Sequence, residues 1–114
     1  MEGIEQTAVL TTLAKVAHAT AMAHGFHEVK PVFGAPGADT RHILSWLALI
    51  HTEVSEAAEE ARKGDKEKFA VELADVVIRV LDVSHALGID IGKAVAAKMA
   101  FNVTRPIKHG GKLA

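Results

Sequence analysis

The chain has 114 residues, a formal charge of −1 and no cysteine. This length fits one domain spanning residues 1–114, because two independent cores would be hard to build from it. The charge excludes a broadly basic nucleic-acid binder, and the lack of cysteine excludes disulfides, thiolate nucleophiles and cysteine-ligated zinc. Hydrophobic residues make up 49% of the chain, with four Phe, one Trp and no Tyr, which favours closely packed helices over a β-sandwich.

The sequence also indicates where the protein works. No segment contains the roughly 18 uncharged apolar residues that a membrane span requires, since Lys15 and His18 interrupt the Ala-rich stretch 7–23. The acidic start, Met-Glu-Gly-Ile-Glu, differs from the basic start of a signal peptide. We therefore expect a cytoplasmic protein with neither a membrane nor a nucleic acid as partner.

Four helices are predicted in chain order. The first runs from Ile4 to His24, and a glycine- and proline-rich loop follows over residues 25–38. The second begins with a cap at Asp39 or Thr40 and continues to Lys63 before Gly64. Asp65 caps the third helix, Lys66 to Leu87, and Asp90 caps the fourth, which ends near Thr104. The short connections predict antiparallel neighbours, and hence an all-α, four-helix antiparallel bundle.

Helical periodicity separates an apolar stripe from a polar edge on the two central helices. The predicted core stripes are Ile43, Leu47, Ile50, Val54, Ala57 and Ala61 on the second helix, and Phe69, Leu73, Val76, Val80, Val83 and Leu87 on the third. Val71 and Ile78 project from a further side of the third helix. A helix that is apolar on several sides usually has a second partner, which in so short a chain points to another subunit.

Two carboxylate pairs lie at the edges of these stripes. Glu53 and Glu56 are spaced i, i+3 on the second helix, and Glu72 and Asp75 have the same spacing on the third. Residues at this spacing are neighbours on a helix surface, so antiparallel packing can bring the two pairs together. Converging carboxylates repel one another, and a hard cation such as Mg²⁺ relieves that repulsion.

The fourth helix carries the opposite charge. Lys98, Asn102 and Arg105 share one face, where lysine offers a point charge, arginine a bidentate fork and asparagine a neutral donor for phosphate. A carboxylate cluster beside such a face indicates a site for a metal ion and a polyphosphate.

Other polar and aromatic residues have simpler explanations. Trp46 and His42 are candidates to contact a substrate, but a core role for Trp46 and a structural role for His42 are favoured. Arg79 is expected to pair with Glu72, Asp75 or Asp82, and Glu60 to be solvated. The histidines at 18, 24, 27, 51 and 85 have no spacing typical of metal ligands, and Asp82-x-x-His85 matches only half of a di-iron carboxylate motif.

Residues 40–112 resemble the MazG-like all-α nucleoside triphosphate pyrophosphohydrolases. The resemblance rests on segments 47–62, 72–82, 87–91 and 98–112, which contain Glu53-x-x-Glu56, Glu72-x-x-Asp75, Lys98-x-x-x-Asn102 and an Arg-Pro-x-x-His-Gly-Gly-Lys ending. It implies that Glu53, Glu56, Glu72 and Asp75 hold Mg²⁺, with Mn²⁺ as a substitute. It also implies that Lys98, Asn102, Arg105 and Lys108 bind the phosphates of a substrate.

The resemblance further implies the reaction and the assembly. Water would attack the α-phosphorus of a (d)NTP, releasing a nucleoside monophosphate and pyrophosphate, and Glu53 is our candidate for the base that accepts the water's proton. Nucleotide-pool cleaning is the corresponding cellular role. The active unit would be a homodimer, or a homotetramer built as a dimer of dimers. A non-catalytic helical module that binds a nucleotide or protein, and a purely structural bundle with solvated acids, remain alternatives.

Overall fold

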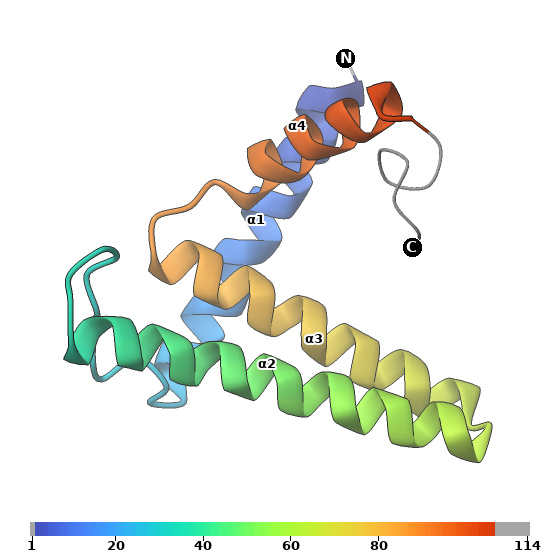
Figure 1. Ribbon diagram of the computed structural model, residues 1–114, viewed down its shortest axis with the longest axis horizontal. Coiled ribbons are helices and arrows are strands. Elements are labelled where there is room, and N and C mark those ends of the chain that lie inside the picture. The colour runs from blue at the N-terminus through green and yellow to red at the C-terminus, as the bar shows by residue number, and fades with distance from the viewer. Residues whose placement is uncertain (1, 107–114) are drawn as a thin grey trace.

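A computed structural model describes the backbone of residues 2–106 and the side chains of residues 8–106. This part of the chain contains four helices and no strand: α1 (Glu2–Ala23), α2 (Ala38–Lys63), α3 (Lys66–Ala86) and α4 (Ile91–Thr104) (Figure 1). The all-α prediction is therefore confirmed, and each helix lies within three residues of its expected bounds. None of the described helices has the length and apolar character that a membrane crossing demands.

The α2–α3 connection shows why the sequence forms a tight helical hairpin. Gly64 has a φ of 74°, a left-handed conformation that a residue with a Cβ rarely adopts. The amides of Gly64 and Asp65 donate to the carbonyls of Ala61 and Glu60, which completes a Schellman motif. The Asp65 carboxylate then accepts a hydrogen bond from the Lys68 amide at 3.0 Å and caps α3 as predicted.

The caps of α2 and α4 differ in kind. Asp90 accepts from the Lys93 amide at 3.0 Å, which confirms it as the N-cap of α4. The predicted cap of α2 at Asp39 or Thr40 is wrong, because α2 begins at Ala38 and its N-cap is Gly37, without a side-chain bond. Asp39 instead accepts from the Val32 amide and Thr40 donates to the Ala35 carbonyl, so both residues hold the preceding loop against the first turn.

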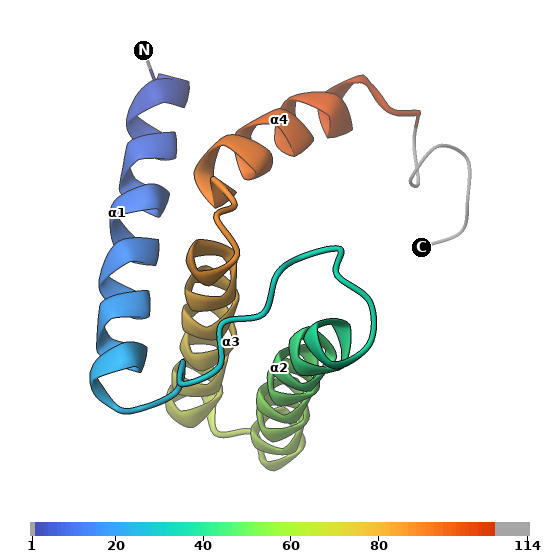
Figure 2. The same ribbon diagram turned by 90° about the vertical axis from the view of Figure 1, so that its left-hand side faces the viewer.

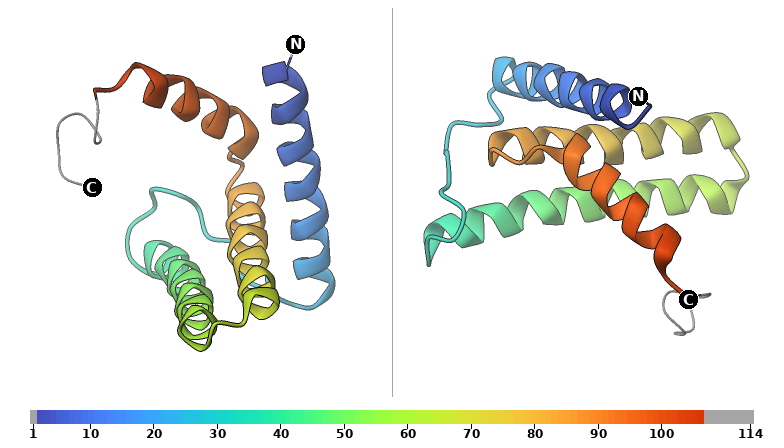
Figure 3. Two further views of the ribbon diagram at one scale, coloured as in Figure 1. Left: turned by 90° about the vertical axis from the view of Figure 1, so that its right-hand side faces the viewer. Right: turned by 90° about the horizontal axis from the view of Figure 1, so that it is seen from above.

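Helix α3 lies between α1 and α2 (Figures 2 and 3). It runs antiparallel to α2, as the short connection predicts, and its other side packs against α1. Helix α4 packs mainly along α1 and is separated from α2 (Figures 1 and 2). The four helices are therefore arranged as an α2–α3 hairpin and an α1–α4 pair joined through α3, and they do not close around one central core.

The side of α2 that faces α3 is rotated from the predicted stripe. Within the described residues, Ile43, Trp46 and Ala57 are its buried positions. Leu47 and Val54 were predicted to be core, but their exposed fractions are 43% and 49%. The rotation occurs because α3 is the main neighbour of α2, so the interface is centred between the apolar stripe and the carboxylate edge. It brings the acidic edge into the helix–helix interface.

A similar rotation affects α3. Leu73, predicted to be core, is 45% exposed, whereas Leu81 and Ser84 are buried. Val71 and Ile78 are exposed, as predicted from their position outside the core stripe. The α2–α3 hairpin therefore leaves several apolar side chains of both helices exposed.

Candidate metal centre

Three of the four predicted metal ligands meet at the α2–α3 interface. Carboxylate oxygens of Glu53, Glu56 and Glu72 all lie within 4.8 Å of one another. The Gly64 turn makes this possible, because it sets the two helices side by side and antiparallel. Asp75, one helical turn beyond Glu72, lies outside this group of three but is close enough for its charge to act on Glu72. Both carboxylate pairs are therefore on the same interface.

Electrostatics at this cluster favour a bound cation. Burial raises the pKa of Glu72, and the carboxyl of Glu56 raises that pKa further, followed by the charges of Asp75 and Glu53. The Oε2 atom of Glu72 is buried and has no hydrogen-bond partner. A buried acceptor without a donor carries an energetic penalty that a cation would remove. The carboxylate cluster, meaning Glu53, Glu56, Glu72 and Asp75, therefore fits a hard divalent ion.

Arg79 supplies the one guanidinium at this cluster among the described residues. Its Nε donates to Oε1 of Glu53 at 3.0 Å, and the side chains are 31% and 14% exposed. The prediction that Arg79 pairs with Glu72, Asp75 or Asp82 is therefore wrong. The spacing on α3 suggested partners on its own helix, whereas the rotation of α2 turns Glu53 toward α3 and into reach of Arg79.

The remaining acids of α2 divide between solvent and interface. Glu59 is exposed and pairs with Arg62 at 2.7 Å, and this contact lowers the pKa of Glu59. The expectation that Glu60 is solvated is wrong: its side chain is 16% exposed and its Oε2 is buried without a hydrogen-bond partner. Glu60 follows Glu53 by two helical turns, so the same rotation directs both toward α3.

Trp46 and His42 lie on the buried side of α2. Trp46 is 8% exposed, which confirms its core position, and the His42 and His27 rings meet it edge-on at centroid distances of 5.2 and 5.1 Å. The Nε2 atom of His42 is buried without a hydrogen-bond partner. The roles of both side chains toward a substrate stay predictions.

The predicted phosphate-binding residues lie apart from the acids within one chain. Lys98 and Asn102 are exposed on α4, and the Lys98 ammonium lies 4.9 Å from the centroid of the Phe101 ring. Arg105, directly after α4, has its guanidinium 5.7 Å from the same ring. Helix α4, which carries Lys98 and Asn102, packs mainly along α1 and is separated from α2 (Figure 1). Lys108 lies outside the described residues.

A groove of about 730 Å³ runs between α1 and α3 beside the cluster. Its walls are mostly apolar, with Leu13 and Val16 from α1 facing Val77 and Ile78 from α3. Glu53, Asp75 and Arg79 also line it. Ligand pockets in proteins commonly have volumes of about 300–1,000 Å³ and combine apolar walls with a few polar groups. The groove therefore offers room for a small molecule next to the carboxylates.

One further group of polar residues was missed by sequence analysis. His18, His27 and Asp82 come together from α1, the 24–37 loop and α3. These residues are 9 and 55 positions apart in sequence, so no local spacing reveals them. The only signal was the number of histidines in the chain, seven of 114 residues.

Comparison with known proteins identifies one family. A model of the MazG nucleotide pyrophosphohydrolase domain matches residues 41–105, which include α2, α3 and α4. No curated protein and no solved structure matches the chain.

Proposed function

Because the chain belongs to the MazG nucleotide pyrophosphohydrolase family, we propose that it hydrolyses a (d)NTP to the monophosphate and pyrophosphate in a Mg²⁺-dependent reaction. The observation that carries the proposal is the convergence of Glu53, Glu56 and Glu72, whose oxygens lie within 4.8 Å of one another. Removal of non-standard or surplus nucleotides from the pool is the role that we assign to this activity.

The carboxylate cluster would hold the metal. Its donors are carboxylate oxygens only, which is the ligand type that Mg²⁺ prefers, with Mn²⁺ as an alternative ion. The partnerless Oε2 of Glu72 and the mutual repulsion that raises the pKa of this residue both support a bound cation. When bound, Mg²⁺ neutralises phosphate charge and lowers the pKa of a coordinated water.

The chain's own residues supply positioning and proton transfer in this proposal. Arg79 fixes the Glu53 carboxylate through a 3.0 Å bond to Oε1. Glu53 is our candidate to accept the proton of the attacking water, because it borders the groove where a ligand has room. Catalysis of phosphoryl-type transfer depends mainly on such positioning and on electrostatics.

Lys98, Asn102, Arg105 and Lys108 are assigned to the substrate phosphates. In a single chain α4 packs along α1, apart from the carboxylate cluster, so we propose that the phosphate-binding residues come from a second subunit in a homodimer or a dimer of dimers. Exposed Leu47, Val54 and Val71 on the α2–α3 hairpin support assembly, since apolar side chains on uncovered helix faces favour association.

A substrate panel tests the activity. Wild-type protein is incubated with a set of (d)NTPs and Mg²⁺, and the monophosphate and pyrophosphate are quantified separately by chromatography. Glu56→Gln should reduce activity by at least about 100-fold, because it removes a proposed ligand. The matched control is Glu59→Gln, which changes an exposed acid one turn further along α2 and should keep near wild-type activity. Equal activity of both variants would contradict the site.

A mixing experiment tests the shared site. Glu56→Gln and Lys98→Ala are each expected to be inactive alone. After denaturation and refolding together, heterodimers would contain one intact site, and random assembly predicts about a quarter of the wild-type activity. No recovery would contradict a site built from two subunits. If none of the (d)NTPs yields pyrophosphate but the protein still binds nucleotide in a Mg²⁺-dependent way, the non-catalytic module is favoured instead.

A further inference from the structure

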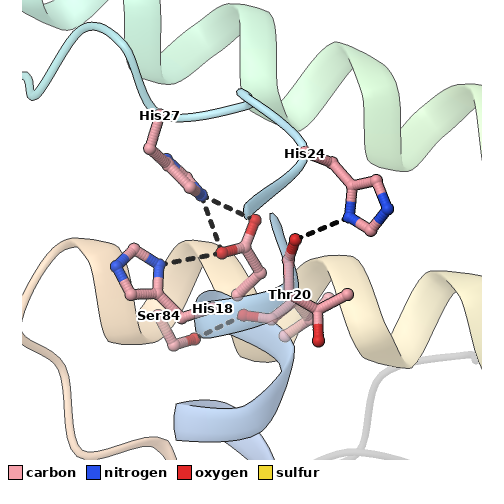
Figure 4. A network of polar contacts seen from close by, with 7 residues as sticks. His18, Thr20, His24, His27 and Ser84 are labelled. Carbon is pink, nitrogen blue, oxygen red and sulfur yellow. Dashed lines mark hydrogen bonds and ion pairs between the residues drawn. The ribbon is translucent and has the colours of Figure 1, made fainter. Parts of the chain in front are cut away.

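A second group of potential metal ligands lies further along the same side of α3, two helical turns beyond Asp75, and its Asp82 lines the same groove. The Oδ1 atom of Asp82 accepts hydrogen bonds from Nδ1 of His18 at 3.0 Å and from Nε2 of His27 at 2.7 Å, and the same His27 nitrogen lies 2.9 Å from Oδ2. Figure 4 shows the rings of His18 and His27 turned toward this one carboxylate. The three side chains are 18%, 4% and 13% exposed, in the order His18, His27 and Asp82.

From this geometry we propose that His18, His27 and Asp82 bind a divalent transition-metal ion of the Zn²⁺ type. One ligand atom from each residue lies within 4.8 Å of the other two. Two imidazole nitrogens with one carboxylate oxygen form a donor set that suits Zn²⁺ and disfavours Mg²⁺, which prefers oxygen ligands. The proposed ion is therefore different in chemistry from the one assigned to the carboxylate cluster.

The two sites are also separate in space. Asp82 follows Asp75 by seven residues on α3, which corresponds to about 10 Å along the helix. No residue belongs to both groups. Loss of one site by mutation therefore leaves all ligands of the other in place.

The distances from the carboxylate to the two imidazole rings are close to those of a zinc site. Ligand atoms at about 2.05 Å from a tetrahedral zinc are roughly 3.3 Å apart. The hydrogen-bonded atoms are 2.7 and 3.0 Å apart, so they would move outward by about half an ångström. A cavity of about 150 Å³ borders both histidines and leaves room for water as a fourth ligand.

A bound ion would hold three elements together. His18 lies on α1, His27 in the 24–37 loop and Asp82 on α3. His27 is the most enclosed of the three, with the Trp46 ring edge-on at 5.1 Å, so its ring is already fixed where the ion would bind. The role that we assign is structural: the ion fastens α1 and the loop to the α2–α3 hairpin.

Cobalt substitution provides the test. Untagged, metal-free protein is titrated with Co²⁺, whose d–d absorption band reports four-coordinate binding, and the same titration is repeated with Zn²⁺ as competitor. Wild-type protein should bind one equivalent of Co²⁺ and show this band, and added Zn²⁺ should displace the Co²⁺. His27→Gln should weaken Co²⁺ binding by at least about 100-fold. His51→Gln, which removes an exposed histidine of α2 outside the group, should leave binding unchanged.

Two further measurements keep the result decisive. Glu56→Gln should bind Co²⁺ as the wild type does, because it alters only the carboxylate cluster. Zn²⁺ should raise the melting temperature of wild type and of Glu56→Gln, but not that of Asp82→Asn, which keeps the size of the side chain. The proposal is overturned if wild type lacks the d–d band, or if His27→Gln and His51→Gln bind Co²⁺ equally well.

Discussion

Replacing Arg79 by methionine should destabilise the protein more than removing a surface cation. The Arg79 Nε lies 3.0 Å from Glu53 Oε1, and the two side chains are 31% and 14% exposed. At an effective dielectric constant of about 20, charges at this distance attract by roughly 5 kcal/mol, and desolvation offsets most of that. The pair is intermediate between surface pairs and fully buried ones, so we expect a loss of about 1–2 kcal/mol. For a chain of this length, that lowers the melting temperature by about 5 °C.

The measurement is urea unfolding followed by far-UV circular dichroism and by Trp46 fluorescence. Protein concentration is held constant, because assembly makes apparent stability concentration-dependent. Arg62→Met is the matched control: its partner Glu59 is 2.7 Å away, but the side chains are 70% and 53% exposed. Such exposed pairs contribute about 0.5 kcal/mol or less.

A double-mutant cycle with Glu53→Gln separates the ion pair from other effects of the arginine. The coupling energy should be about 1 kcal/mol or more. Saturating Mg²⁺ should reduce the loss in Arg79→Met, because the ion would neutralise the same carboxylate. Equal losses in Arg79→Met and Arg62→Met, or an additive cycle, would refute this reasoning.

Three other predictions follow from the fold and the site. The pKa of Glu72 is raised in the folded state, so this carboxyl should stabilise the metal-free protein most below its unfolded pKa. That stabilisation should be lost as the pH rises through the folded pKa. Urea unfolding of wild type and Glu72→Gln between about pH 4 and 8 measures the difference in stability. Gly64→Ala should cost about 1 kcal/mol in the same assay, since the residue has a φ of 74°. Thr20→Trp, on the α1 wall of the groove, should raise the KM for the nucleotide about tenfold and leave the melting temperature nearly unchanged; an unaltered KM would place the ligand elsewhere.

Local sequence signals predicted the helices well. Gly64 after Lys63, with Asp65 as the next cap, fixed the α2–α3 turn, and Asp90 fixed the start of α4. These signals are reliable because a left-handed glycine and a capping carboxylate act within a few residues of chain. The cap of α2 was misassigned, since Asp39 and Thr40 bond to the loop before them and no local pattern distinguishes the two uses.

Tertiary contacts explain the remaining differences. The carboxylate spacing predicted that Glu53, Glu56 and Glu72 could converge. Helical periodicity, however, predicts the buried face of α2 only to within about 100° of rotation around the helix, the step of one residue. The resulting rotation exposed Leu47 and Val54 and paired Glu53 with Arg79. The contact of Asp82 with two histidines could not be predicted from the sequence, because it joins α1, a loop and α3 through packing that no short segment encodes.

Only one wall of the groove beside the carboxylates lies within the family match. Its α3 wall, with Asp75 and Val77, falls inside the matched residues 41–105, whereas the α1 wall, with Leu13, Val16 and Thr20, falls outside them. The family match therefore covers the half of the groove that carries the acids and does not extend to the opposite half. If the groove holds the proposed substrate, substitutions on α1 would change which nucleotide fits while leaving the carboxylate cluster unaltered.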